Sequence, residues 1–201
     1  RFCPTPANIP QLDADGQDIA PDPTGQFAGC VVNVKSDTHV GKVCLARIYR
    51  GTMSTSTLVA GPSSERGEKL GGLFRLVGKK REPLTEPACP GEIVAFSKVE
   101  KLPVWAVFSE PGKDRPTLRT PVVQTPMVAQ AVFPKSRADE QKIGEALSKL
   151  AAEDPTFKIE HNAETHELVV HGMSDLHLLV AFDRLKRRYG VEVETKLPRI
   201  S

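Results

Sequence analysis

The chain has 201 residues, and its 27 basic and 25 acidic residues leave a formal net charge of only +2. This length accommodates one large domain or two small ones, and the near-neutral balance excludes a polycation that binds nucleic acid through its global field. No apolar run approaches the roughly 20 residues of a membrane-spanning helix, and the four cysteines form no CxxC pair that would indicate zinc or a disulfide framework.

Residues 1–26 are expected to form an extended lead-in. The apolar residues of this stretch show no periodicity, and five prolines interrupt it: Pro4, Pro6, Pro10, Pro21 and Pro23. Proline fixes φ and removes a backbone donor, so such a segment is typical of a connection that wraps another surface or crosses between domains. The chain also begins at Arg1 instead of a methionine, from which we expect a piece of a longer protein.

Residues 27–110 are expected to form a small β-barrel. Short runs rich in valine, isoleucine and aromatic residues alternate with glycine turns, and no helical periodicity lies between them. These runs are FAGCVVNVKS, GKVCLARIYRG, STLVAG, LGGLFRLVG and GEIVAFSKV. Five or more closely spaced strands are typical of a barrel. The proline-rich residues 111–126 then predict a linker, and we expect the domains on its two sides to behave as separate bodies.

Residues 127–201 are expected to form a ferredoxin-like α+β domain of order β-α-β-β-α-β. The strands are predicted at MVAQAVF, TFKIEH, ELVVH and VEVET. Ser136 is a good N-cap for the first helix, and Asp154-Pro155 stops it. The apolar stripe of this helix consists of Ile143, Ala146, Leu147, Leu150 and Ala151.

The segment HGMSDLHL opens the second helix, which is predicted from about Ser174 to Tyr189 with Gly190 as its C-cap. Gly172 is expected to let the chain turn sharply from strand to helix, since glycine tolerates a positive φ. Ser174 can cap the helix. The residues expected to face the sheet are Leu178, Leu179, Phe182 and Leu185, and those expected on another face are His177, Arg184 and Arg188.

Two long stretches resemble elongation factor G. PKSRADEQKIGEALSKLAAEDPTFKIEHNAETHELVVHGMSDLHL is similar to its domain III, and VGKVCLARIYRGTM is similar to its domain II. AEDPTF followed by HGM-x-x-LHL is the more specific signature, because the separation also matches. The barrel motif is shared by many translational GTPases. The segment HGMSDLHL, with RRYGVEVET following, resembles a divergent elongation factor G-like branch. The chain also departs from the family late in the barrel, where it lacks the usual G-D-T-L turn.

The resemblance implies a translation-factor β-barrel followed by a ferredoxin-like domain, in a cytoplasmic protein that acts in translocation or ribosome recycling. Its partners would be small-subunit ribosomal RNA and protein, its own G domain and its C-terminal domains, with no membrane and no DNA. The parent protein would be a GTPase that uses GTP and Mg²⁺. This chain has no GxxxxGK[ST] loop, so we expect a central fragment that is not an enzyme, with no catalytic, cofactor or metal site.

The resemblance also implies two kinds of site. Positive side chains bind phosphate without base-specific geometry, and the candidates for ribosome contact are Arg66, Lys69, Arg75, Lys79, Lys80, Arg81, Arg184, Arg187 and Arg188. For each of these, a solvated charged surface is the competing interpretation. The candidates for interdomain coupling lie in the strand-to-helix turn: Gly172, Met173, Ser174 and His177.

Other interpretations stay open. Another translational GTPase, of the ribosome-protection or back-translocation type, shares the barrel motif. An independent RNA-recognition module has the same β-α-β-β-α-β order, but its third strand would need stacking aromatics that ELVVHGM lacks. A small-molecule regulatory domain would not need the barrel. A hairpin could bring His161 near His171, yet no cysteine or carboxylate set completes a metal site with them.

Overall fold

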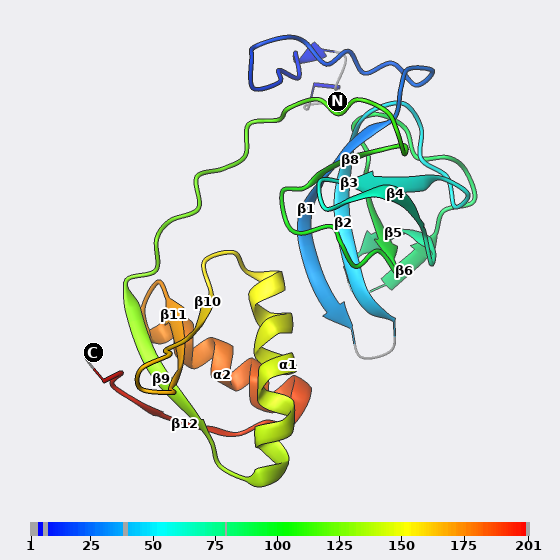
Figure 1. The fold of residues 1–201 in the computed structure, drawn as a ribbon. Helices are drawn as coiled ribbons and strands as arrows, with labels where there is room; N and C mark the ends of the chain where they lie inside the picture. The colour runs from blue at the N-terminus through cyan, green and yellow to red at the C-terminus, as the bar shows by residue number, and fades with distance from the viewer. Residues whose placement is uncertain (1–3, 6–7, 38–39, 79, 200–201) are drawn as a thin grey trace. The chain divides into compact units, whose positions relative to one another are not determined.

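The structure is a computed structural model that describes residues 4–5, 8–37, 40–78 and 80–199 (Figure 1). The chain divides into two compact units, Arg1–Pro121 and Val122–Ser201. The division therefore lies inside the expected linker segment 111–126. Among the described residues, no helix is both long enough and apolar enough to cross a bilayer.

The first unit is a sheet of eight strands that curls around an apolar core (Figure 1). The strands are β1 Ala28–Asp37, β2 Gly41–Arg50, β3 Leu58–Gly61, β4 Ser64–Lys69, β5 Leu73–Val77, β6 Lys80–Pro83, β7 Ile93–Ser97 and β8 Val107–Ser109. Their spatial order is β4-β3-β8-β1-β2-β7-β5-β6, and the neighbouring strands pair antiparallel. This barrel-like architecture confirms the fold predicted for the first half.

The alternation of side chains along β2 explains how the sheet encloses its core. Successive side chains of a strand point to opposite faces of the sheet. In β2, the residues that face the core are Cys44, Ala46 and Ile48, and those that point away from it are Leu45, Arg47 and Tyr49. Gly51 follows the strand with a φ of 71°. A Cβ there would lie 2.5 Å from Phe27 Cα, so this position accepts only glycine.

The lead-in is hydrogen-bonded to other parts of the first unit. Ile19 is buried, and the Gly51 N–H donates to the carbonyl of Asp22 at 2.8 Å. The Ala14 N–H donates to the carbonyl of Thr117 at 2.6 Å. These contacts place the lead-in against both the end of β2 and the segment that follows β8.

The second unit is a four-stranded antiparallel sheet with two helices packed against its apolar face (Figure 1). Its elements are β9 Val128–Pro134, α1 Arg137–Glu153, β10 Lys158–His161, β11 Leu168–Gly172, α2 Asp175–Tyr189 and β12 Val193–Lys196. The spatial order is β10-β11-β9-β12. The ferredoxin-like β-α-β-β-α-β prediction is therefore confirmed.

The predicted helix caps are present. The hydroxyls of Ser136 and Ser174 each accept a hydrogen bond at 3.1 Å from the N–H three residues later, and Asp154 is the C-cap of α1. Gly190 ends α2 in the left-handed region with a φ of 65°. The stripe of α1 is buried as expected through Ile143, Ala146, Leu147 and Leu150, with Ala151 partly buried.

The predicted buried face of α2 is wrong at one position. Leu179 is 61% exposed, and Ala181 is buried together with Leu178 and Leu185. Each helical residue is rotated by about 100° from the one before it, so the step from Leu178 to Leu179 leaves the core-facing stripe. Phe182 packs against the core but is only partly buried.

Gly172 does not use the positive φ that glycine tolerates. Its φ does not lie in the positive region, unlike that of Gly190. A Cβ on Gly172 would instead lie 2.6 Å from Cδ2 of Leu178. The glycine is required because α2 approaches the end of β11 too closely for any side chain.

Candidate functional site

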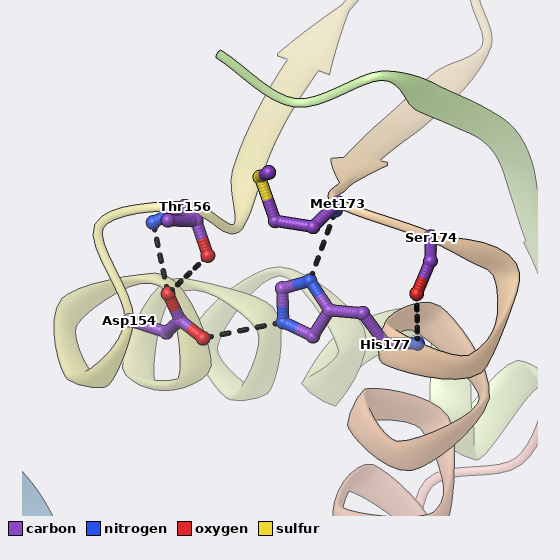
Figure 2. A network of polar contacts seen from close by, with 5 residues as sticks. All are labelled: Asp154, Thr156, Met173, Ser174 and His177. Atoms are coloured by element: carbon purple, nitrogen blue, oxygen red, sulfur yellow. Dashed lines mark hydrogen bonds and ion pairs between the residues drawn. The ribbon is translucent and has the colours of Figure 1, made fainter. Parts of the chain in front are cut away.

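The two signature segments of the second unit meet where α1 ends and α2 begins (Figure 2). Nε2 of His177 lies 3.2 Å from Oδ2 of Asp154, and Nδ1 accepts a hydrogen bond from the Met173 N–H at 3.1 Å. Because Nδ1 accepts there, the ring proton lies on Nε2 and points at the carboxylate. We call this group the α1–α2 junction: Asp154, Thr156, Met173, Ser174 and His177.

The other carboxylate oxygen of Asp154 is held by Thr156. Oδ1 accepts from the Thr156 N–H at 2.8 Å and from its hydroxyl at 2.6 Å. Burial raises the pKa of Asp154, but the Thr156 hydrogen bonds and the nearby His177 outweigh it, so the pKa lies below its ordinary value. The ring of Phe157 also packs edge-on against His177 at 6.2 Å. The two signatures are therefore in contact through their side chains.

An ion pair also joins α1 to α2. Nη1 of Arg188 lies 2.9 Å from both carboxylate oxygens of Glu153, whose side chain is only 9% exposed. The last turn of α1 holds no basic residue, so Glu153 and Asp154 lie unfavourably at the negative end of the helix dipole. Arg188 from α2 supplies a positive charge at this helix end, and His177 from α2 donates a hydrogen bond to Asp154.

These contacts change the interpretation of the basic end of α2. Arg187 pairs with Asp183 one turn earlier, and Lys186 pairs with Glu192 at 2.8 Å. Arg184 is exposed and has no ion pair within the described part of the chain. Of the three predicted RNA-contact arginines of α2, only Arg184 thus presents an uncompensated charge.

Strands β5 and β6 carry three of the predicted contact residues of the barrel. Arg75 pairs with Glu92 at 2.5 Å, and Arg81 pairs with Asp37. Lys80 is exposed at the first position of β6, opposite Val77. Among the described residues of these two strands, Lys80 therefore presents a free cation beside two cations that are already paired.

The remaining candidates of the barrel lie on or next to edge strands of the sheet. Arg66 and Lys69 are exposed residues of β4, and neither forms an ion pair with any other described residue. In hydrogen-bonding order β4 and β6 are the two outermost strands. Lys79 lies outside the described residues.

The β10–β11 hairpin does not place His161 opposite His171. His161 lies opposite Leu168 in the β10–β11 hairpin, and His171 lies opposite Lys158. Nε2 of His171 is 3.1 Å from a carboxylate oxygen of Glu160. Among residues that the structure describes, no group of three or more histidine, cysteine, aspartate or glutamate side chains is arranged to hold a metal ion.

Sequence reasoning named Met173, Ser174 and His177 but missed their partners Asp154 and Thr156 as site residues. It also missed Glu153, whose carboxylate holds Arg188. The available signal was that AEDPTF and HGMSDLHL together form one signature of the family resemblance, and both segments contribute to the junction.

Two sequence families match the chain, one in each unit. The family described as Elongation factor G domain 2 matches residues 26–105, and Elongation Factor G, domain III matches residues 123–197. A crystal structure of ttk003000868 from Thermus thermophilus is similar, with a TM-score of 0.75 and 34% identity over 88% of this chain. The chain spans only 26% of the length of that protein. The chain therefore belongs to the elongation factor G family, with a domain 2 followed by a domain III.

Proposed function

We propose that this chain provides ribosome binding and interdomain coupling in an elongation factor G-like translational GTPase of the cytoplasm, which acts in translocation or ribosome recycling. The matched domain 2 and domain III support this role. They also favour it over an independent RNA-recognition module. GTP and Mg²⁺ are assigned to a G domain outside this chain, because the sequence has no phosphate-binding loop of the GxxxxGK[ST] type.

The observation that carries the proposal is the position of the α1–α2 junction on α2. The junction lies in the first turn of this helix of 15 residues, and the free guanidinium of Arg184 lies nearer its other end. At 1.5 Å per residue the helix is about 22 Å long. Because α2 is one packed element, a contact that displaces one end also moves the other, which is what coupling between two partners requires.

The uncompensated cations support contact with RNA. Arg184, Lys80, Arg66 and Lys69 are exposed and have no ion pair among the residues described. Such groups gain the full attraction of a phosphate and release its counterions. Arg187 and Arg188 must first give up Asp183 and Glu153, so we assign them a smaller part in binding.

The coupling is tested with His177→Ala in the full-length protein that contains this chain. The variant loses both ring contacts that join β11, α2 and the end of α1. We expect ribosome-stimulated GTP hydrolysis to fall by roughly 5–150-fold, the usual range of a coupling between sites, while the affinity of the free factor for GTP stays the same.

The matched control is His166→Ala, in the turn before β11, which should retain the stimulated rate. His177→Gln should restore part of it, since a glutamine side chain offers both a donor and an acceptor. A folded His177→Ala protein with the full stimulated rate would contradict the coupling role of the junction.

A further inference from the structure

A buried carboxylate lies on the face of the four-stranded sheet that is turned away from the helices. Leu168 and Val170 of β11 pack into the helix-facing core, so alternation turns Val169 and Glu167, which directly precedes β11, to the opposite face. Glu167 is only 6% exposed. Burial of a carboxylate is costly unless hydrogen-bond donors compensate its charge, so the partners of Glu167 indicate its role.

The turn between β10 and β11 fixes the position of Glu167. The side-chain oxygen of Asn162 accepts hydrogen bonds from the N–H groups of Glu164 at 2.9 Å and Thr165 at 3.0 Å. The Asn162 N–H donates to the carbonyl of Glu167 at 3.0 Å, and the Thr165 hydroxyl lies 3.3 Å from Oε2 of the Glu167 carboxylate. Local contacts thus hold the carboxylate at one place on the open face of the sheet.

The other partner of this carboxylate comes from the segment that follows β12. Oε2 of Glu167 accepts from the backbone N–H of Arg199 at 3.0 Å, and Nε of Arg199 lies 3.4 Å from Oε1. The Arg199 side chain is 77% exposed, so solvent screens its contact. The backbone N–H instead donates to a buried carboxylate, which makes a charge-assisted hydrogen bond. The backbone contact is therefore the stronger of the two.

This contact requires the segment after β12 to cross the sheet. β12 ends at Lys196, and β9 lies between β12 and β11. Neighbouring strands are about 4.8 Å apart, so residues 197–199 leave the edge strand and pass over β9 to reach Glu167. Pro198 is half-buried. We call residues 197–199 the strap.

We propose that Glu167 anchors the strap to the open face of the sheet and thereby sets the direction in which the chain leaves domain III. Pro198 has a fixed φ, so the hydrogen bond at Arg199 restrains a segment that is already short and stiff. The anchor is separate from the α1–α2 junction, because the helices pack on the other face of the sheet. Glu167 is thus a positioning residue for whatever follows the strap in the full-length protein.

Amide hydrogen exchange of the isotope-labelled 201-residue chain tests the anchor. In the wild type, we expect the Arg199 N–H to exchange roughly 10-fold or more slowly than an unprotected amide. Glu167→Ala should remove this protection, and Glu167→Gln should restore part of it, since an amide oxygen still accepts a hydrogen bond. Arg199→Gln should retain the protection, because the backbone donor is unchanged. The matched control is Glu194→Ala, which removes an exposed carboxylate of β12 and should retain it as well.

Exchange within β11 separates anchoring from general stabilisation of the sheet. We expect Glu167→Ala to release the Arg199 N–H while the protected amides of β11 keep their rates. If the β11 amides and the Arg199 N–H accelerated by the same factor, Glu167 would serve only the stability of the sheet, and the proposal would be overturned. It would also be overturned by an unprotected Arg199 N–H in the wild type, or by full protection in Glu167→Ala.

The effect on the direction of the chain is measured in the full-length protein, and this step rests on the proposed function. Distances between a spin label on α1 and one beyond the strap should spread over a wider range in Glu167→Ala than in the wild type or in Glu194→Ala. The same distance distribution in all three would overturn the positioning role. Neither measurement uses the ribosome or a nucleotide, so failure of the anchor is distinguishable from failure of the proposed ribosome binding.

Discussion

Gly172 is the last residue of β11, and His177 lies in the first turn of α2. Close neighbours limit which side chain each position accepts. At Gly172 the constraint is space, because an added Cβ would come within 2.6 Å of Leu178 and 3.2 Å of the His177 ring. Leu178 is fully buried and His177 is held at both ring nitrogens. Neither neighbour is free to retreat from a new side chain.

We therefore expect Gly172→Ala to lower the free energy of unfolding by about 1–3 kcal/mol through overpacking. Gly172→Asn should lower it further, because its side chain is larger. Gly144→Ala is the matched control, since nothing lies within 4 Å of its added Cβ and alanine in an exposed helix gains about 0.5–1 kcal/mol over glycine. Urea unfolding followed by circular dichroism measures all three. If asparagine were better tolerated than alanine, a left-handed conformation at Gly172 would be indicated instead.

Asp154 makes the junction sensitive to acid. Burial acts to raise its pKa, yet the hydrogen bonds from Thr156 and the contact with His177 lower it below its ordinary value. A carboxylate with a depressed pKa stabilises the folded chain fully above the unfolded-state pKa of about 3.9 and loses this contribution as the pH falls through the folded-state pKa. We expect the destabilisation caused by Asp154→Asn to be largest at neutral pH and to shrink below about pH 4. A destabilisation that stays constant across unfolding curves from neutral to acidic pH would rule out this role.

At the scale of the elements, α1 and α2 are joined at two neighbouring acidic residues, the last residue of α1 and its C-cap. Glu153 binds Arg188 and Asp154 binds His177. The local signals of these helices were readable in the sequence, because caps such as Ser136 and Gly190 act on their own backbone. The ion pairs were not readable, because Glu153 and Arg188 are distant in sequence and meet only when the helices pack. The exposure of Leu179 and the space around Gly172 likewise depend on how closely α2 approaches β11.

A double-mutant cycle on Glu153→Gln and Arg188→Gln measures the stronger of these links. The carboxylate is nearly buried and accepts two hydrogen bonds, but the guanidinium is 38% exposed. We expect a coupling energy of about 1 kcal/mol, at the upper end of the range for exposed pairs. The Asp183–Arg187 pair, exposed at 54% and 69%, should couple by only about 0.3–0.5 kcal/mol and weaken with salt. Equal coupling in the two pairs would show that burial of Glu153 contributes nothing.

At the scale of the whole molecule, the barrel class of the first domain and the β-α-β-β-α-β order of the second followed from periodicity, turns and the family resemblance, whereas the order of the strands in each sheet did not. The candidate site followed only in part. The coupling residues of the turn were named from the resemblance. Which basic residues are already paired with a carboxylate could not be read from the sequence, because the fold brings the partners close: Asp37, Glu92, Asp183 and Glu153. A count of lysines and arginines therefore overstates the surface that is free to bind phosphate.

The salt dependence of ribosome binding shows whether the basic end of α2 contacts ribosomal RNA. In the full-length protein, Arg184→Gln should weaken ribosome affinity and reduce the slope of log affinity against log salt by about 0.7–0.9, the value of one lost phosphate contact. Arg187→Gln is the matched control and should change the slope less, because Arg187 is already paired with Asp183. GTP binding to the free factor should be the same in all variants. An unchanged affinity and slope for Arg184→Gln across the salt series would contradict the assignment of α2 to the ribosome.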